Sequence, residues 1–309
     1  MTSATKLWAD GVSVPLTTPF KADDSVDTDA LATQVVRLAK AGVGIVLLGT
    51  NGEATPPLLV GTGAGSAATT IEVTKEAAAA GATHAIVICP GYFAFAMGRD
   101  RAAIIAFFEQ VMDASPIPVM IYNFPGAAAG IDLTSDELIT LSNHPNCFGA
   151  KLTCAMIGKG QRLAAHVQSD AYVAAHSQLK GVTVTGQFQV LPGFSESLLP
   201  SIVARHTGCI TGTGNVFPKT IARLYKQSVK GLQGNAEAMA EAHKLQDRVA
   251  RSDFIIVKAG IQGTKHALDV FVQPGLGGRA RLPLGPCSDE VKKMVETELK
   301  EDWEFECSL

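Results

Sequence analysis

Two residues able to do carbonyl chemistry each follow a short apolar run of this 309-residue chain. Lys151 follows residues 147–150, and Tyr122 follows residues 118–121. An ammonium buried in an apolar strand loses hydration, which lowers its pKa and favours the neutral amine that attacks a carbonyl. A tyrosine ending a neighbouring strand would move protons for the resulting imine. For Lys151 alone, a side chain that extends its charged head to solvent is the competing interpretation.

The elements that position these residues follow a repeated pattern. Short apolar, β-branched runs alternate with Ala-rich helical stretches, which is typical of β/α units and a parallel sheet. Most of the runs are followed by Gly, Pro or a small polar residue. Eight parallel strands close into a (β/α)8 TIM barrel whose chemistry lies at the carboxyl ends of the strands. The runs are 12–16, 44–48, 58–61, 85–89, 118–121, 147–152, 188–191 and 209–211.

Helical stretches fill the connections and continue beyond the last strand. Within the barrel they are predicted at 28–41, 66–81, 100–113, 135–143 and 195–206. Further stretches at 217–230, 236–251, 254–268 and 288–300 exceed the one helix that a barrel needs to close. We therefore expect a (β/α)8 barrel over 11–231 and a C-terminal helical extension over 232–309, both in the same structural unit.

The composition favours an intracellular enzyme that acts on small molecules. The formal net charge is −3, with no basic run, which argues against nucleic acid or a membrane as partner. No apolar stretch reaches the roughly 18 residues of a membrane helix, and the start lacks the apolar core of a signal peptide. The 6 cysteines form no CxxC pair and the 7 histidines no HExxH motif. We predict a cytoplasmic protein with no metal and no cofactor.

Two glycine-rich stretches follow predicted strands. Residues 61–66 (GTGAGS) lack the Lys-Ser/Thr of a P-loop and the third glycine of GxGxxG, so a tight turn is the favoured interpretation over nucleotide binding. Residues 49–53 (GTNGE) combine backbone N–H groups with a hydroxyl at a strand end, which can hold a carboxylate. This second stretch is the candidate anion site.

Together, GTNGE after strand two, the YNFPG of residues 122–126 and the GAK of residues 149–151 resemble the dihydrodipicolinate synthase/N-acetylneuraminate lyase family. The resemblance runs from about Gly11 to the C-terminal helices and includes residues 15–20 (PLTTPF). It implies a (β/α)8 barrel with extra C-terminal helices, a homotetramer built as a dimer of dimers, and a Schiff base between a lysine and pyruvate or another 2-oxo acid. The implied partner is this small-molecule substrate.

The resemblance also assigns roles to residues of this chain. Lys151 corresponds to the imine-forming lysine, and Tyr122 to the tyrosine that moves protons to and from substrate oxygens. Thr50 and Asn51 correspond to the pair that binds the pyruvate carboxylate. Tyr92 corresponds to a tyrosine lent across the tight dimer interface. The protonated imine is an electron sink that lets a C–C bond be made or broken without a metal.

Three more positions line the implied pocket: Thr153, where the lyases carry a hydroxyl, Gly193 and Ile210. Departures from the family's pattern then favour one subfamily. The synthases have Arg where this chain has Ala127, and losing a bidentate Arg should cost an anionic acceptor about 1.5 to 3 kcal/mol.

The Asn after Thr50 resembles instead the 4-hydroxy-2-oxoglutarate aldolases and 2-keto-3-deoxy sugar-acid aldolases. We therefore favour a carbon-carbon lyase that cleaves a 4-hydroxy-2-oxo acid or a 2-keto-3-deoxy sugar acid to pyruvate (or glyoxylate plus pyruvate) and an aldehyde. The alternatives are 4-hydroxy-tetrahydrodipicolinate synthase and a catalytically impaired barrel that acts as a binding protein.

The connection between strands two and three is short. A parallel crossover needs about a dozen residues or more, usually with a helix. Residues 54–57 (ATPP) reach roughly 13 to 14 Å when extended, and their two prolines disfavour a helix. The sequence therefore predicts a barrel that lacks the helix between these strands and is strained beside Thr50 and Asn51.

Overall fold

The computed structural model describes residues 6–47, 57–98 and 100–309. Its sheet has eight strands in the order β7-β6-β5-β4-β3-β2-β1-β8. Sequential strands are neighbours and the last strand adjoins the first, which is the topology of the predicted (β/α)8 barrel. The strands are β1 (Gly11–Pro15), β2 (Gly44–Leu47), β3 (Leu58–Gly61), β4 (His84–Ile88), β5 (Val119–Asn123), β6 (Cys147–Leu152), β7 (Gln189–Pro192) and β8 (Gly208–Ile210).

The helices confirm the predicted alternation of β and α elements. Several begin where a side chain accepts a hydrogen bond from the first turn, as Asp27, Ser66, Asp100 and Thr134 do. Four helices were not predicted: α3, α6, α7 and α12. The helices are α1 (Thr28–Lys40), α2 (Ala67–Ala79), α3 (Ala94–Met97), α4 (Arg101–Ala114), α5 (Ser135–Ser142), α6 (Ile157–Val167), α7 (Asp170–Ala175), α8 (Leu198–Val203), α9 (Pro218–Leu232), α10 (Ala236–Ala267), α11 (Asp289–Glu298) and α12 (Lys300–Ser308).

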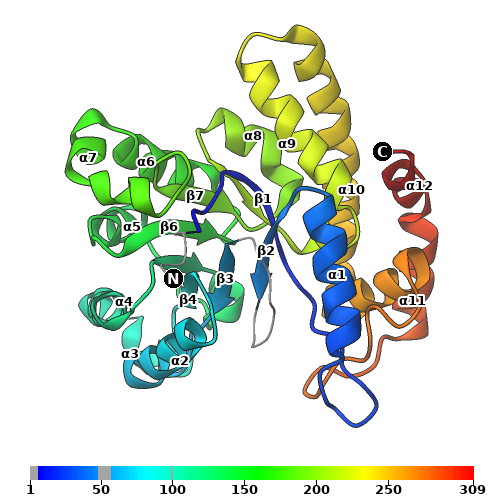
Figure 1. The fold of residues 1–309 in the computed structure, drawn as a ribbon, viewed down its shortest axis with the longest axis horizontal. Helices are drawn as coiled ribbons and strands as arrows, with labels where there is room; N and C mark the ends of the chain where they lie inside the picture. Colours follow the sequence, from blue (N-terminus) through cyan, green and yellow to red (C-terminus); the bar gives the residue numbers. More distant parts are fainter. Residues whose placement is uncertain (1–5, 48–56, 99) are drawn as a thin grey trace, which may run out of the picture. The chain divides into compact units, whose positions relative to one another are not determined.

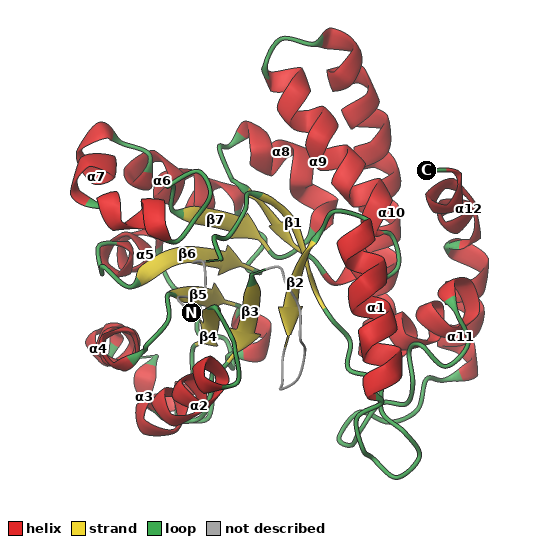
Figure 2. Cartoon of the chain, in the orientation of Figure 1, coloured by secondary structure: helices red, strands yellow, loops and turns green. Residues whose placement is uncertain are grey.

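The chain divides into two compact units. The first comprises Met1–Asp10, Val46–Gly193 and Val203–Cys209, and the second comprises Gly11–Ile45, Phe194–Ile202 and Ile210–Leu309. In the first unit, strands β3 to β7 pair in parallel and helices α2 to α7 lie outside them (Figure 2). This unit contains the carboxyl ends of β5 and β6.

The core of the first unit explains why β5 and β6 are fixed. Val119, Met120 and Ile121 of β5, and Phe148 and Ala150 of β6, are all 0% exposed. Burying an aliphatic or aromatic side chain of this size contributes roughly 1.5 to 3 kcal/mol. These apolar residues therefore fix the strand register that sets the positions of the polar residues at the strand ends.

The second unit is mainly helical. Helices α9 and α10 lie side by side (Figure 1). A core cluster joins α10 to the segments around it and includes Phe217, Ile256, Leu268 and Val295. This cluster supplies the apolar contacts that a helical extension of this length requires.

Helix α10 corrects one prediction, since it continues through the break expected at residues 252–253. The two polar residues there have hydrogen-bond partners: the Ser252 hydroxyl donates to Arg248 O within the helix at 3.2 Å, and the Asp253 carboxylate accepts the hydroxyl of Ser195, outside the helix, at 2.9 Å. The helix instead bends at Gly260, whose φ of 67° and ψ of −168° are not helical. A positive φ of this kind suits glycine because it has no Cβ.

The predicted absence of a helix between strands two and three concerns residues 48–56. Strand β2 ends at Leu47 and β3 begins at Leu58, as the sequence predicts to within one residue. The intervening residues 48–56 lie outside the described residues, so the missing helix stays a prediction.

Candidate active site

Strands β5 and β6 bring Tyr122 and Lys151 together. The two residues are register partners in the parallel pair, one residue before the end of each strand. Lys151 is 6% exposed, and its Nζ lies 4.1 Å from the centroid of the Tyr122 ring. The sequence prediction that these residues lie close together at the carboxyl ends of neighbouring strands is therefore confirmed.

The environment of Lys151 favours its neutral form. Burial lowers the pKa of Lys151 to about 8 from 10.5, while a charge on Cys209 would act in the opposite direction. Within the part of the chain that the structure describes, no hydrogen bond holds the Lys151 ammonium. At pH 7 a pKa of 8 leaves about a tenth of the side chain as free amine, against less than a thousandth at the ordinary value. Lys151 thus has the chemistry of a nucleophile.

Tyr122 lies over this amine as a neutral phenol. Burial raises the pKa of Tyr122, so the hydroxyl keeps its proton at neutral pH. The ring is stacked on Phe124 with centroids 5.7 Å apart and an interplanar angle of 27°. Because packing fixes the ring, the phenol has a defined position from which to donate or accept a proton.

Thr153 and Gly193 complete this group within the first unit. The Thr153 hydroxyl is near enough to Tyr122 to lower the phenol's pKa, which opposes the larger effect of burial. Yet among the described residues Thr153 Oγ1 is buried without a hydrogen bond of normal geometry. Such a hydroxyl is available to a ligand oxygen.

Gly193 lies directly against Thr153 and cannot be replaced without movement. A Cβ built on Gly193 would lie 1.9 Å from Thr153 Oγ1. The Gly193 N–H donates to Leu152 O at 3.1 Å, which holds the end of β7 beside the end of β6. The resemblance assigns Thr153 and Gly193 to the lining of the pocket, and this role in substrate binding stays a prediction.

A polar network that sequence reasoning missed holds the segment after β5. Asn123 Nδ2 donates to Asp132 Oδ1 at 2.8 Å, and Asn123 Oδ1 accepts the Leu133 N–H at 3.0 Å. Asp132 also forms an ion pair with the buried Lys159 of α6. The Thr153 N–H donates to Asn123 O at 2.9 Å, so the network reaches the site. The sequence signal that could have indicated this network is the position of Asn123, directly after Tyr122 at the end of the predicted strand.

A second ion pair fixes the same segment from α4. Arg101 forms a bidentate pair with Glu137 and donates to Asp132 O at 3.0 Å. Glu137 also accepts the Thr134 N–H at 2.7 Å and completes the capping box of α5. No sequence pattern indicated that Arg101 and Glu137 would meet, because they lie on different helices.

The remaining predicted residues are not brought into this group. Thr50 and Asn51 lie outside the described residues. Ile210 ends β8 and is fully buried, and it belongs to the second unit. Tyr92 follows β4, is 81% exposed and packs its ring against Phe93 at 5.0 Å. The exposed Ala127 occupies the position at which the resemblance implied an arginine.

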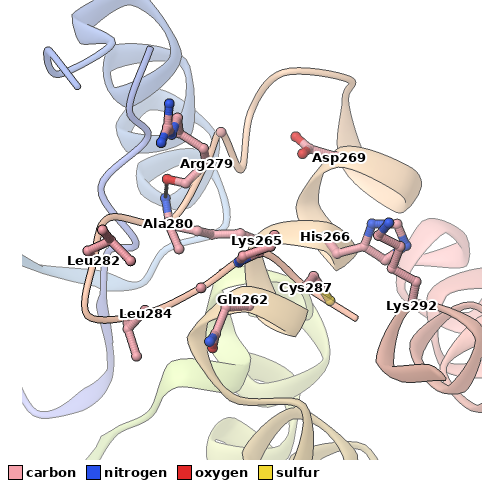
Figure 3. A pocket seen from close by; sticks show the side chains of 13 residues that line it. Gln262, Lys265, His266, Asp269, Arg279, Ala280, Leu282, Leu284, Cys287 and Lys292 are labelled. Atoms are coloured by element: carbon pink, nitrogen blue, oxygen red, sulfur yellow. Dashed lines mark hydrogen bonds between the residues drawn. The ribbon is translucent and has the colours of Figure 1, made fainter. Parts of the chain in front are cut away.

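A second lysine with a lowered pKa lies in the second unit, beside a cavity of about 420 Å³ (Figure 3). Burial lowers the pKa of Lys265 to about 8, and the nearby Asp269 acts in the opposite direction. Unlike Lys151, its Nζ donates to three carbonyls: Thr18 O at 2.5 Å, Gly277 O at 2.8 Å and Arg279 O at 3.0 Å. All three ammonium protons are used, which makes Lys265 a structural lysine.

Comparison with known proteins places the chain in a family. Residues 54–302 match the dihydrodipicolinate synthetase family. A 4-hydroxy-2-oxoglutarate aldolase of Emericella nidulans, described as mitochondrial, is 34% identical, with 93% of each chain covered. An L-threo-3-deoxy-hexylosonate aldolase of Aspergillus niger is 33% identical over 97% of this chain and 96% of its own. The chain belongs to the dihydrodipicolinate synthetase family.

Synthases match this chain at lower identity, and one of Methanothrix thermoacetophila is 28% identical over 91% of this chain and 92% of its own. A 4-hydroxy-tetrahydrodipicolinate synthase of Stenotrophomonas maltophilia is 31% identical over 69% of this chain and 72% of its own. Among solved structures, a family protein of Coccidioides immitis is 29% identical with a TM-score of 0.79, and each chain is covered completely. A family protein of an E. coli prophage, solved with pyruvate, is 25% identical with a TM-score of 0.77, over 94% of this chain and 98% of its own.

Proposed function

We propose that this protein is a pyruvate-dependent aldolase that forms a Schiff base at Lys151. The observation that carries the proposal is a buried lysine with a pKa of about 8 and no hydrogen bond in the described part of the chain, beneath a tyrosine ring. Family membership supports it, as do the two aldolases that match this chain over more than nine-tenths of its length.

The chemistry follows from the two side chains. The Lys151 amine attacks the C2 carbonyl of a 2-oxo acid, and water leaves to give a protonated imine. Tyr122 gives its phenol proton to the departing water, and the resulting phenolate then accepts the proton of the 4-hydroxyl as the C3–C4 bond breaks and the bonding electrons enter the iminium. An aldehyde departs and an enamine remains. Protonation at C3 and hydrolysis of the imine release pyruvate and restore the free amine.

The substrate class we propose is a 4-hydroxy-2-oxo acid or a 2-keto-3-deoxy sugar acid. Ala127 offers no guanidinium to a second carboxylate, which disfavours aspartate semialdehyde and, among the cleavage substrates, favours a 2-keto-3-deoxy sugar acid with an uncharged aldehyde portion over 4-hydroxy-2-oxoglutarate. Thr153 would bind the oxygen of the departing aldehyde, since its buried hydroxyl lies by Tyr122 and makes no hydrogen bond of normal geometry among the described residues. Thr50 and Asn51 would hold the pyruvate carboxylate, and Gly193 and Ile210 would line the pocket.

Assembly and location complete the proposal. We infer a homo-oligomer, a dimer of dimers, in which Tyr92 reaches a neighbouring subunit, because Tyr92, Phe93 and Phe95 form an exposed aromatic group (81%, 51% and 76%). No helix in the described residues has the length and apolarity to cross a membrane. A cytoplasmic location stays a prediction, and so does a boundary between barrel and C-terminal helices near residue 231.

The test is borohydride reduction in the presence of pyruvate. Intact-mass spectrometry should show one reduced pyruvyl group, and peptide mapping should place it on Lys151 and leave Lys265 unmodified. An unmodified chain would favour the binding-protein alternative, and a label on another lysine would refute the role of Lys151. Coupled pyruvate release from 4-hydroxy-2-oxoglutarate and from a 2-keto-3-deoxy sugar acid then tests the reaction, and faster condensation with aspartate semialdehyde would indicate the synthase.

A further inference from the structure

A hollow in the second unit gathers positive side chains from two helices. It has a volume of about 720 Å³, and six cations line it: Arg37 and Lys40 of α1 and Lys219, Arg223, Lys226 and Lys230 of α9. We call this group the basic hollow. The α9 residues recur at intervals of four, three and four, so they share one face of the helix. No Asp or Glu side chain is among the lining residues.

Little of this charge is neutralised by the protein. Arg223 pairs with Glu241, an exposed contact that contributes little free energy. The Glu306 carboxylate lies beneath, but it accepts the backbone N–H groups of Lys219 and Thr220, at 2.9 and 2.8 Å. Among the described residues, no carboxylate is within ion-pair distance of Lys40, Lys226 or Lys230. The chain as a whole is acidic, with a net charge of −3, so composition does not account for the hollow.

The fold does not require this arrangement. Arg37, Lys40 and Lys230 lie in last helical turns, where the helix dipole favours a cation. Lys219 instead lies in the first turn of α9, where the dipole disfavours one. Like charges at intervals of three or four on a helix destabilise it by about 0.2 to 0.5 kcal/mol per pair. A stripe that works against its own helix indicates selection for an external anion.

We propose that the basic hollow binds a small molecule that carries two or more phosphate groups. Arg37 donates to Gln34 Oε1 and to Asn215 O, and Arg223 is paired, so the four lysines remain, which is more charge than one carboxylate or one phosphate neutralises. A volume of about 720 Å³ lies in the range of small-molecule sites, and Pro218 and Ala222 supply apolar wall between the cations. Arginine and lysine are the residues that bind phosphate oxygens by charge-assisted hydrogen bonds. This site is independent of the proposed aldolase chemistry.

Isothermal titration at 0.15 M salt tests the proposal, with tripolyphosphate and ATP as probes and acetate as the control anion. Tripolyphosphate should bind with one-to-one stoichiometry and acetate should not. Binding of tripolyphosphate alone identifies a free polyphosphate, and tighter binding of ATP identifies a nucleotide. Either supports the site. No heat with either probe would refute it, as would tighter binding of a single-stranded oligonucleotide than of both, which would make the ligand a nucleic acid.

Charge-reversal variants locate the binding. Lys226→Glu and Lys230→Glu should each weaken tripolyphosphate binding by about tenfold and reduce its salt dependence. Lys75→Glu on the exposed face of α2 makes the same change in net charge away from the hollow and should leave the affinity unchanged. An equal loss in all three variants would show non-specific attraction and overturn the proposal. Circular dichroism and the yield of the pyruvyl adduct on Lys151 verify that each variant is folded.

Discussion

Two lysines in different units of this molecule share a pKa of about 8 and differ in everything else that matters to reactivity. Lys265 donates each ammonium proton to a backbone carbonyl, whereas Lys151 has no hydrogen bond in the described part of the chain. A lowered pKa reports burial, which the two share. The lack of a hydrogen bond on Lys151 among the described residues is what distinguishes it, as a nucleophile, from the structural cation Lys265.

The three carbonyls around Lys265 also show what that lysine does. They belong to Thr18, Gly277 and Arg279, so one side chain of α10 fixes two loop segments. A neutral amine has two protons and would leave one carbonyl without a donor. Lys265 is therefore held as the cation, with no lone pair for a carbonyl substrate, despite a pKa that matches that of Lys151.

Substitution by methionine should separate the two lysines most strongly in activity. Lys151→Met removes the nucleophile, and we expect pyruvate release to fall by about 10³-fold or more, with no borohydride adduct. Lys265→Met should retain both pyruvate release and the borohydride adduct on Lys151, measured per folded molecule. Comparable turnover in the two variants, measured by coupled pyruvate release, would remove the distinction drawn between them.

The same pair should behave oppositely in stability. Lys265→Met leaves three buried carbonyls without a donor, and we expect a loss of about 3 to 5 kcal/mol of unfolding free energy. Lys151→Met removes a buried cation that has no hydrogen bond among the described residues, and should be neutral or stabilising by up to about 3 kcal/mol at pH 7. Urea denaturation of both variants measures these changes. A larger loss for Lys151→Met would mean that its ammonium has a structural role.

Removing the phenol tests the group that is unique to the Lys151 site. Tyr122→Phe keeps the ring and its stacking on Phe124, and we expect kcat to fall by about 10²-fold as proton transfer fails. The imine itself should still form, so the adduct on Lys151 should remain detectable. An unchanged kcat would exclude Tyr122 as the proton shuttle.

Two threonines allow a matched comparison of hydroxyls. Thr153 Oγ1 makes no hydrogen bond of normal geometry among the described residues, whereas the Thr213 hydroxyl donates to the buried Asp253. Thr153→Val should lower kcat by about tenfold with stability unchanged or improved, because it removes an unsatisfied polar group. Thr213→Val should lower stability by about 1 to 3 kcal/mol. Thermal melts and steady-state kinetics together would show whether Thr153 serves a ligand or the fold.

The sequence was sufficient for the strands and for the Lys151–Tyr122 pair, because both depend on local patterns. Apolar runs placed all eight strands to within one or two residues, and the end of a strand places its last side chains. The contacts of Lys159 with Asp132 and of Arg101 with Glu137 join elements far apart in sequence. The hydrophobic periodicity of the sequence cannot predict such ion pairs, because each of these residues, taken alone, looks like any other charged residue.

Helix α10 and Lys265 show the same limit. A polar pair at residues 252–253 indicates a helix end locally, yet hydrogen bonds to the Asp253 carboxylate from Ser195 and Thr211 satisfy it inside the helix. Lys265 lies in an ordinary helical stretch, and its three acceptors come from segments that sequence patterns do not place. The roles of Lys265 and Lys151 can therefore be distinguished from the structure but not from the sequence.

The smallest expected effect is the pH dependence of imine formation, and it bears on the cause of the lowered pKa. The folded pKa of Lys151 lies below its unfolded value, so neutral amine accumulates as the pH rises through about 8. The rate of adduct formation with pyruvate should rise about fivefold between pH 7 and 8 and level off above about 9.

The same lowering of the Lys151 pKa makes folding more favourable as pH rises from about 8 to 10.5, because only the unfolded state still binds the proton there. Lys151→Met should reduce that increase but leave the part that Lys265 contributes through its equally lowered pKa, while Lys265→Met should leave the kinetic profile unchanged. A rate that keeps rising to pH 10 would mean that the amine keeps an ordinary pKa, and that burial in the apolar end of β6 is not what activates it.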